Sequence, residues 1–227
     1  MHRRIAIVAA MMLGLTFCWG PAQSASKTLQ IPPIAQSKTA WCWLAASEMV
    51  FRYYHVPAIN PINYQCGLAA AVFGGPCVLN CNLCNVGSGP VDTIKYLLLN
   101  YPAFARNTTL KTGPDLSADV TTSELSEDDV KGEIDAGRPV IAGISPHSGL
   151  LPPGLSEHAV LIVGYTENSV GLFLIVNDPF PYDMFGMPDP YTHKGGVRIT
   201  AGRYRISYDT MVNALAWGNT VSGIDAQ

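Results

Sequence analysis

Cys42 stands between two tryptophans, Trp41 and Trp43, at the head of an apolar run. A cysteine in such a place can be a buried apolar residue, half of a disulfide, or a nucleophile. A nucleophilic cysteine attacks as the thiolate, and an ordinary thiol with a pKa of about 8.5 is mostly protonated at neutral pH. The chemistry therefore needs a helix N-terminus or an imidazolium to lower that pKa, a base, a residue that orients the base, and donors for an oxyanion.

Of the five histidines, His158 is the best candidate for the base. It opens residues 158–165, the most hydrophobic run of the chain, and a titratable residue that leads a buried strand can present its ring at the rim of a cleft. His55, His147 and His193 lie at a helix end or in loops, where a structural role is expected, and His2 lies in the N-terminal segment.

The residue that orients the base is expected where the next apolar run, residues 171–178, ends in Asn177 and Asp178. The polar segment between the two runs predicts a β-hairpin, in which the start of one strand lies beside the end of the other. His158 would then neighbour Asn177 or Asp178. Side chains alternate between the two faces of a strand, so only one of them can meet the imidazole. The alternative reading of Asp178 is an ordinary Asp-Pro turn.

The N-terminus predicts export. A basic head, residues 1–4, precedes an apolar run of 13 residues, which is roughly 20 Å long as a helix and too short to span a bilayer of about 30 Å. Small residues follow at cleavage-type spacing, so residues 1–24 are interpreted as a secretory signal peptide, which carries Cys18 away with it. The expected location is secreted or periplasmic.

Export changes the interpretation of the remaining five cysteines. In an oxidising compartment four would pair, and Cys42 stands apart from the cluster, which leaves it as the free thiol. The cluster consists of Cys66, Cys77, Cys81 and Cys84. Its spacing allows a tetrahedral zinc site, but the exported location favours two disulfides, and three connectivities are possible. No metal or other cofactor is expected.

The order of predicted elements indicates an α+β fold rather than alternating βαβ units. Helices are expected at residues 41–54, 89–101 and 126–137, with Ser126 as N-cap and Gly137 at the C-terminal stop. A Cys-, Asn-, Gly- and Pro-rich irregular segment separates the first two. Strands are expected at residues 138–145, 158–165, 171–178 and 196–207, followed by a short helix near 208–215.

Composition excludes some classes of function. The 227 residues are 48% hydrophobic and 14% charged, as in a globular protein, and the net charge is −3. No cluster of Lys and Arg occurs outside the first four residues, so nucleic-acid binding has no electrostatic footprint. No segment after the signal peptide is apolar for long enough to cross a membrane.

Three blocks of the sequence together resemble the papain-like cysteine proteases: "QSKTAWCW", "EHAVLIVGY" and "IVNDP". In that family a glutamine six residues before the nucleophile helps to form the oxyanion hole, and Gln36 precedes Cys42 by six. The order Cys, His, Asn/Asp also matches. The resemblance implies a two-lobe fold, with a helical half that carries the cysteine helix and an antiparallel β half that carries the histidine.

The blocks differ from those of plant papain and the cathepsins, because the "CGSCW"-type signature is missing. They are most similar to a compact bacterial branch, the AvrRpt-type proteases (peptidase family C70), with the C39 peptidases as more distant relatives. In those relatives the third member is usually the Asp of an "xDP" motif, which favours Asp178 and keeps Asn177 as the alternative. The resemblance implies a protease domain over residues 27–222, with a helical lobe at about 36–137 and a β lobe at about 138–215.

The expected activity is that of a secreted or periplasmic cysteine endopeptidase acting on a protein or peptide substrate. In it Cys42 attacks, His158 moves the proton, Asp178 orients His158, and Gln36 with the Cys42 N–H holds the oxyanion. Two alternatives stay open: an acyltransferase or amidase with the same triad, and an inactive papain-like binding module. About ten residues separate the signal region from Gln36, which leaves no room for a papain-type prodomain, and a monomer is expected.

Overall fold

The structure is a computed structural model, and it describes residues 25–147, 151–152 and 154–227. The predicted signal peptide and Cys18 lie outside the described residues. Among the residues that are described, no helix is long and apolar enough to cross a membrane.

Three predicted helices are present. The first, α1 (Cys42–Tyr53), begins at Cys42, and its residues 43–51 are all buried, so the helix lies inside the molecule. The second, α4 (Asp92–Thr109), is longer than predicted because it continues through Pro102. The third, α5 (Glu127–Asp135), has Ser126 as its N-cap, whose Oγ accepts the Asp129 N–H at 3.2 Å.

The segment predicted to be irregular contains helices of its own. They are α2 (Tyr64–Phe73), α3 (Pro76–Leu79) and the 3₁₀ turn η1 (Cys81–Cys84). Two disulfides, Cys66–Cys81 and Cys77–Cys84, tie the three together, which confirms the prediction of disulfides and selects one of the three connectivities. Cys42 is the free cysteine of the described residues. These helices were not predicted, because glycines interrupt the apolar pattern of the segment. The two disulfides hold the helices together.

The strands form one antiparallel sheet in the order β2-β8-β3-β4-β5-β7-β6, and β1 pairs with β4 beside this path. The hairpin of β4 with β5 is present as predicted, joined at Asn168 and Gly171. Three strands lie outside the predicted runs, namely β1, β2 and β8. The bounds are β1 (Ala25–Thr28), β2 (Leu116–Thr121), β3 (Val140–Ile144), β4 (His158–Asn168), β5 (Gly171–Asn177), β6 (Val197–Thr200), β7 (Arg203–Ser207) and β8 (Asn219–Ala226).

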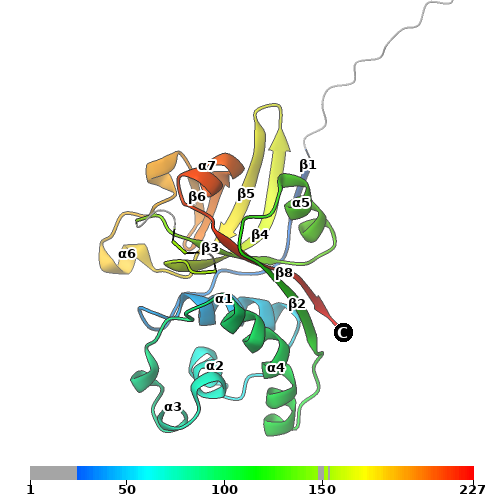
Figure 1. The fold of residues 1–227 in the computed structure, drawn as a ribbon, viewed down its shortest axis with the longest axis vertical. Helices are drawn as coiled ribbons and strands as arrows, with labels where there is room; N and C mark the ends of the chain where they lie inside the picture. Colours follow the sequence, from blue (N-terminus) through cyan, green and yellow to red (C-terminus); the bar gives the residue numbers. More distant parts are fainter. Residues whose placement is uncertain (1–24, 148–150, 153) are drawn as a thin grey trace, which may run out of the picture.

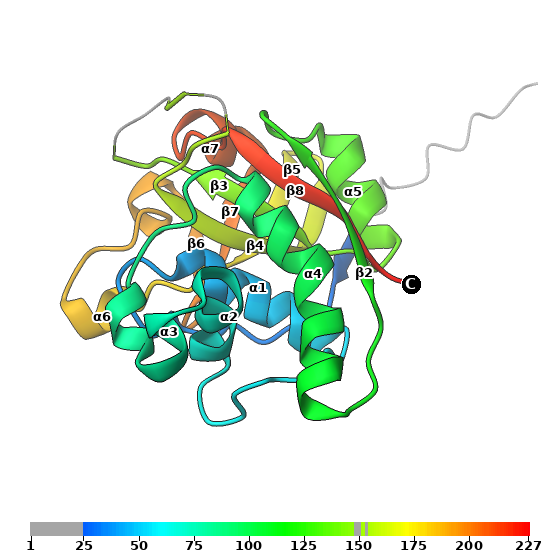
Figure 2. The same ribbon diagram turned by 60° about the horizontal axis from the view of Figure 1, so that its bottom comes forward.

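Three short helical elements complete the fold: α6 (Tyr182–Phe185), η2 (Thr192–Lys194) and α7 (Tyr208–Asn213). Figure 1 shows α1 to α4 together below the sheet, with α5 and α7 above, and Figure 2 shows α2 and α4 in front of α1. Helix α1 contacts β4, α2 and α4, so it lies between the sheet and the other helices. The predicted α+β class is confirmed, and the first residue of α1 is brought to the sheet.

Candidate active site

The nucleophile candidate sits at the uncapped end of a helix. Trp41 is the N-cap of α1 and makes no side-chain capping bond, and the first intrahelical bond runs from the Ala45 N–H to the Trp41 carbonyl. The N–H groups before Ala45 therefore have no partner within the helix. The backbone N–H groups of Trp43 and, on β4, of Ala159 contribute to lowering the pKa of Cys42. The N-terminus of α1 thus favours a thiolate at Cys42.

His158 joins the cysteine to a buried carboxylate. Its Nε2 lies 2.7 Å from Asp178 Oδ1, and its side chain also interacts with Cys42, which contributes to raising the pKa of His158. Since Nε2 is engaged by Asp178, Nδ1 is the ring nitrogen that remains for the sulfur. The side chain of His158 is 12% exposed and that of Asp178 is fully buried, so only the imidazole and the thiol reach the surface of this site.

The electrostatics make Cys42 and His158 an ion pair. Burial raises the pKa of the Cys42 thiol, but the hydrogen bond and charge of His158, with the two N–H groups, outweigh it, and the pKa lies below its ordinary 9.0. Burial also disfavours the imidazolium, yet the charge of Asp178, its hydrogen bond and the contact with Cys42 raise the pKa of His158 to about 10. Between these two pKa values the site holds a thiolate beside an imidazolium.

The register of the hairpin decides which of the two candidate residues faces His158. Leu161 pairs with Asn177, and continuing that register places Asp178 opposite Val160, on the same face as His158. The register shifts by one residue between Ile162 and Gly164. Without this bulge, Asn177 would stand opposite Ile162 and would share the face of His158. The bulge thus turns Asp178, not Asn177, toward the imidazole.

Asn177 is occupied elsewhere. It is completely buried, its Nδ2 donates to the Ile31 carbonyl at 2.8 Å, and its Oδ1 accepts from Arg203 Nε at 2.8 Å. The guanidinium of Arg203 also donates to the Ile31 carbonyl. Asn177 therefore links the segment around Ile31 to β5 and β7, on the face away from His158.

Asp178 has three further hydrogen-bond partners that the sequence did not single out. The Phe180 N–H donates to Oδ1 at 2.7 Å, while Tyr182 and Tyr191 hydroxyls donate to Oδ2 at 3.2 and 3.0 Å. Burial and then the charge of Asp178 raise the pKa of both tyrosines, so both hydroxyls stay protonated. The Phe180 ring stands edge-on to His158, with ring centroids 6.3 Å apart. The sequence does not indicate that Tyr191 contacts Asp178, because the loop after Asp178 brings Tyr191 back to it.

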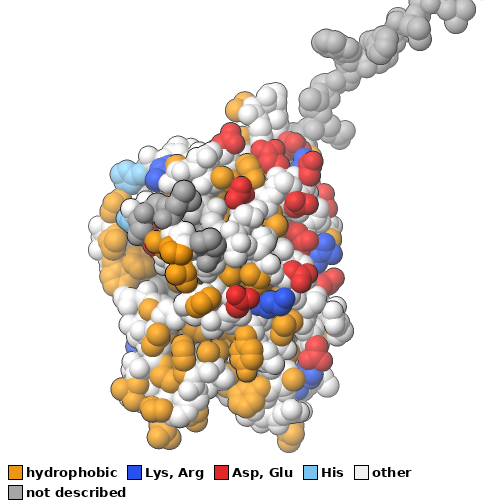
Figure 3. Space-filling model, in the orientation of Figure 1, with side chains coloured by type: hydrophobic (Ala, Val, Ile, Leu, Met, Phe, Trp, Pro, Cys, Tyr) orange, Lys and Arg blue, Asp and Glu red, His pale blue; other side chains and the backbone are white. Residues whose placement is uncertain are grey.

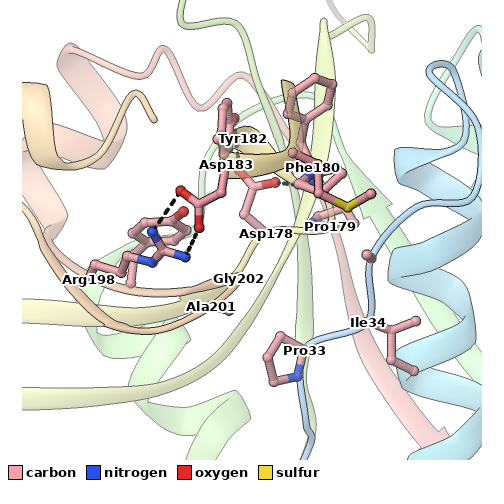
Figure 4. A pocket seen from close by; sticks show the side chains of 14 residues that line it. Pro33, Ile34, Asp178, Pro179, Phe180, Tyr182, Asp183, Arg198, Ala201 and Gly202 are labelled. Carbon is pink, nitrogen blue, oxygen red and sulfur yellow. Dashed lines mark hydrogen bonds and ion pairs between the residues drawn. The ribbon is translucent and has the colours of Figure 1, made fainter. Parts of the chain in front are cut away.

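A cavity of about 290 Å³ lies behind this carboxylate. Figure 4 shows Phe180 and Tyr182 beside Asp178, and the Asp183 carboxylate facing the Arg198 guanidinium, which it binds through both oxygens. A second cavity of about 300 Å³ lies between the segment before Cys42 and the segment after Asp178. It is lined by Ala35, Gln36, Ser37, Lys38, Thr39, Asn85, Pro181, Met184 and Phe185.

Gln36 lies in the loop before Cys42, but its amide is turned into that loop. Its Nε2 donates to the Lys38 and Thr39 carbonyls, both at 2.8 Å, and its Oε1 is buried without a hydrogen-bond partner among the described residues. The side-chain N–H groups thus hold the loop in this conformation. An oxyanion role for Gln36 stays a prediction that requires its amide to rotate.

The remaining histidines lie outside this cluster. His147 is 73% exposed, and its Nδ1 lies 3.2 Å from a Glu157 oxygen. His55 ends the loop after α1, and His193 lies in the exposed turn η2. Among the described residues, no group of three or more His, Cys, Asp or Glu side chains is arranged to hold a metal ion.

Residues 28–214 match the model of a family described as "Peptidase_C39 like family". The chain belongs to this family. The C39 relationship, expected as the more distant one, is thus the one that is shown, while a place in the AvrRpt-type branch stays a prediction. The family supports a cysteine peptidase. No curated protein matches the sequence.

Solved structures of papain-like proteases share the fold. A structure from a study of the mite allergens Blo t 1 and Der p 1 has a TM-score of 0.52 at 15% identity, with 95% of this chain and 74% of that one covered. Procathepsin L 3 of Tenebrio molitor larval midgut has a TM-score of 0.50 at 13% identity, covering 91% and 71%. Procathepsin L2 from the same source has a TM-score of 0.49 at 11% identity. The match covers 84% of this chain but only 64% of that protein. The first two of these structures show that the α+β fold is papain-like.

Proposed function

We propose that this protein is an exported cysteine endopeptidase that hydrolyses peptide bonds through Cys42, His158 and Asp178. The observation that carries the proposal is the placement of Cys42 at an uncapped helix N-terminus and beside His158, whose Nε2 lies 2.7 Å from a buried carboxylate. Nucleophile, base and orienting residue are the parts that acyl transfer by a cysteine requires.

The mechanism follows from the charges of the pair. The Cys42 thiolate attacks the carbonyl carbon, and the carbonyl π electrons move to its oxygen, which faces the free N–H groups at the start of α1. His158 gives its proton to the leaving amine as the C–N bond breaks, and a thioester on Cys42 remains. Neutral His158 then takes a proton from water, which attacks the thioester and releases the carboxylic acid with Cys42 as thiolate.

Asp178 acts throughout by position and charge. Its Oδ1 keeps the Nε2–H side of His158 fixed, so Nδ1 stays directed at the sulfur and the leaving group. The carboxylate stabilises the imidazolium that is present before attack and again after water has been deprotonated. Four donors, counting Phe180, Tyr182, Tyr191 and His158, satisfy its two oxygens in the absence of solvent.

The decisive experiment is cleavage of a peptide library by the chain from residue 25 onward, with products read by mass spectrometry. Hydrolysis that is lost in Cys42→Ser and retained in a surface control, Ser88→Ala, supports the proposal. Products that carry an added amine in place of water would instead identify an acyltransferase with the same triad. Absence of any turnover, with Cys42 buried or unreactive, would favour the inactive binding module.

The proposed location is outside the cytoplasm. Two disulfides in a segment of nineteen residues, Cys66 to Cys84, are typical of proteins that fold in an oxidising compartment. The composition of residues 1–24 supplies the export signal. Finding the mature chain in the periplasm or medium, cut near residue 24, tests this part of the proposal, and a full-length cytoplasmic product would contradict it.

A further inference from the structure

The disulfide-stapled segment, residues 65–86, ends against the loop that precedes Cys42. Here "nucleophile loop" means residues 35–41. Cys84, Asn85 and Val86 follow directly on the Cys77–Cys84 disulfide, and each makes a hydrogen bond to the nucleophile loop or the first turn of α1. Three consecutive residues of the segment therefore contact the residues on either side of Cys42.

Asn85 holds the loop through its side chain. Its Oδ1 accepts the Ala40 N–H at 3.0 Å, and its Nδ2 donates to Thr39 Oγ1 at 2.9 Å. An amide that accepts with one end and donates with the other fixes both position and orientation of the two residues it binds. Asn85 itself is exposed, so its contacts serve the loop and not the core.

The two tryptophans that flank the nucleophile are held by the same segment. Trp41 Nε1–H donates to the Cys84 carbonyl at 2.7 Å, and Trp43 Nε1–H donates to the Val86 carbonyl at 3.2 Å. Both rings are buried, with 0% and 1% exposure. The residues before and after Cys42 are therefore anchored to the backbone just beyond a disulfide.

The other end of the loop is held from beside the second disulfide. Gln65, next to Cys66, accepts the Ser37 N–H at 2.7 Å and donates to the Ala35 carbonyl at 3.0 Å. Gln65 also donates to the buried Glu48 of α1 at 2.9 Å. Asn85 and Gln65, the two amides that contact the nucleophile loop from the stapled segment, thus each stand beside a cross-linked cysteine, and the disulfides fix the spacing between them.

We propose that the stapled segment is a positioning device for the nucleophile, in which Asn85 and Gln65 hold the two ends of the nucleophile loop and the disulfides hold Asn85 and Gln65. The device keeps the first N–H groups of α1 and the Cys42 sulfur in register with His158 and Ala159 on β4. Asn85 is a positioning residue and takes no part in bond making. The inference rests on the proposed function only in that Cys42 is the reactive group.

The test is the rate of Cys42 alkylation by iodoacetamide between pH 4 and pH 10, on the chain from residue 25 with its disulfides intact. Asn85→Ala removes both side-chain bonds while the fold keeps its core. We expect alkylation near neutral pH to slow by about five- to ten-fold, since two neutral hydrogen bonds that hold the nucleophile loop are lost. We also expect the pH midpoint to rise, because the thiolate loses its alignment with its partners.

The matched control is Asn82→Ala, three residues earlier in the same turn, whose side chain makes no hydrogen bond within the described part of the chain. Thr39→Val removes one of the two Asn85 bonds, and its effect should not add to that of Asn85→Ala. The double variant Cys77→Ser/Cys84→Ser should reproduce the Asn85→Ala profile while far-ultraviolet circular dichroism stays that of a folded protein.

A wild-type alkylation rate and midpoint in Asn85→Ala would overturn the proposal, as would an equal loss in Asn82→Ala. The readout is independent of peptide hydrolysis. If the wild-type chain cleaves no peptide but the alkylation differences appear, the proposed endopeptidase activity fails and the positioning role stands. If peptides are cleaved but Cys42 of Asn85→Ala is alkylated at the wild-type rate, the endopeptidase activity stands and the positioning role fails.

Discussion

At the scale of single residues, Asp178 sets the charge state of the site. Its charge is the main reason that the pKa of His158 is raised to about 10. In Asp178→Asn the imidazole keeps a polar neighbour but loses that charge, so the His158 pKa falls and the thiolate at Cys42 becomes less favourable. We expect kcat/KM to drop by about ten-fold or more, because one pKa unit corresponds to a factor of ten. We also expect the alkaline limb of the pH profile of kcat/KM to move to lower pH.

The comparison variant is Asn177→Ala. Asn177 holds the Ile31 carbonyl and Arg203 on the other face of β5, so this change should lower the unfolding free energy by about 1–3 kcal/mol and leave the pH midpoints in place. A pH profile that moves with Asn177 and not with Asp178, measured on folded protein, would reverse the assignment of the third residue.

A separate prediction concerns Tyr191, one of the two tyrosines that donate to the Asp178 carboxylate. Tyr191→Phe removes a 3.0 Å hydrogen bond from a hydroxyl to a buried carboxylate oxygen and leaves the ring in place. Hydrogen bonds to charged groups contribute about 1.5–3 kcal/mol, so the denaturant midpoint should fall accordingly. The surface variant Tyr96→Phe, on the exposed side of α4, should leave the denaturant midpoint unchanged.

Three residues that the sequence singles out, Cys42, His158 and Asp178, lie together in the structure, and their catalytic roles stay predictions. Cys42, His158 and Asp178 carried visible signals: a lone cysteine before a helix, a histidine before a buried strand, and an acid after the next one. Which of Asn177 and Asp178 faces His158 depends on the β-bulge between Ile162 and Gly164. The residue types at this position do not predict the bulge. Tyr191 and Asn85 lie in loops, and Gln65 lies in the unpredicted helix α2, so the local sequence pattern does not indicate which residues they contact.

At the scale of elements, the helices and strands with regular periodicity were predictable, and α2, β2 and β8 were not. Helix α2 depends on its disulfide and on the Asn63 N-cap, and β2 is a mostly polar strand that pairs with β8 at the edge of the sheet. These elements are specified by distant partners. Helix α5 is the contrasting case, since Ser126 and the acidic first turn are local signals that the structure confirms.

The N-cap of α5 therefore offers a test that should not touch the site. In Ser126→Ala the Asp129 N–H loses its acceptor, which costs about 0.5–2 kcal/mol. We expect a lower melting temperature by differential scanning calorimetry and an unchanged Cys42 alkylation rate. A change in that rate would mean that α5 is coupled to the site through β4.

At the scale of the whole molecule, apolar and acidic side chains are separated. Figure 3 shows acidic groups along the edge near α5 and β2, and apolar groups over the helices below. Exposed apolar side chains on the stapled segment and its neighbours include Val78, Leu79 and Leu83. Val78 and Leu79 are neighbours in α3, and Leu83 lies in η1, so these apolar side chains are exposed on the stapled segment itself.

The prediction at this scale is that the chain from residue 25 is a monomer and is reactive without further processing. Size-exclusion chromatography with light scattering should give the mass of one chain at micromolar concentration. Iodoacetamide should label Cys42 in that sample before any proteolysis. A stable dimer, or labelling that appears only after cleavage of the chain, would contradict it.

The central claim is that Cys42 and His158 form a thiolate–imidazolium pair, and the alkylation rate of Cys42 against pH tests it most directly. The rate should rise as the pH climbs through the lowered Cys42 pKa, well below 9, and should change again near pH 10, where His158 loses its proton. In His158→Ala the first rise should move up toward the ordinary thiol value of about 8.5–9. An unchanged profile in His158→Ala, on a folded protein, would contradict the account.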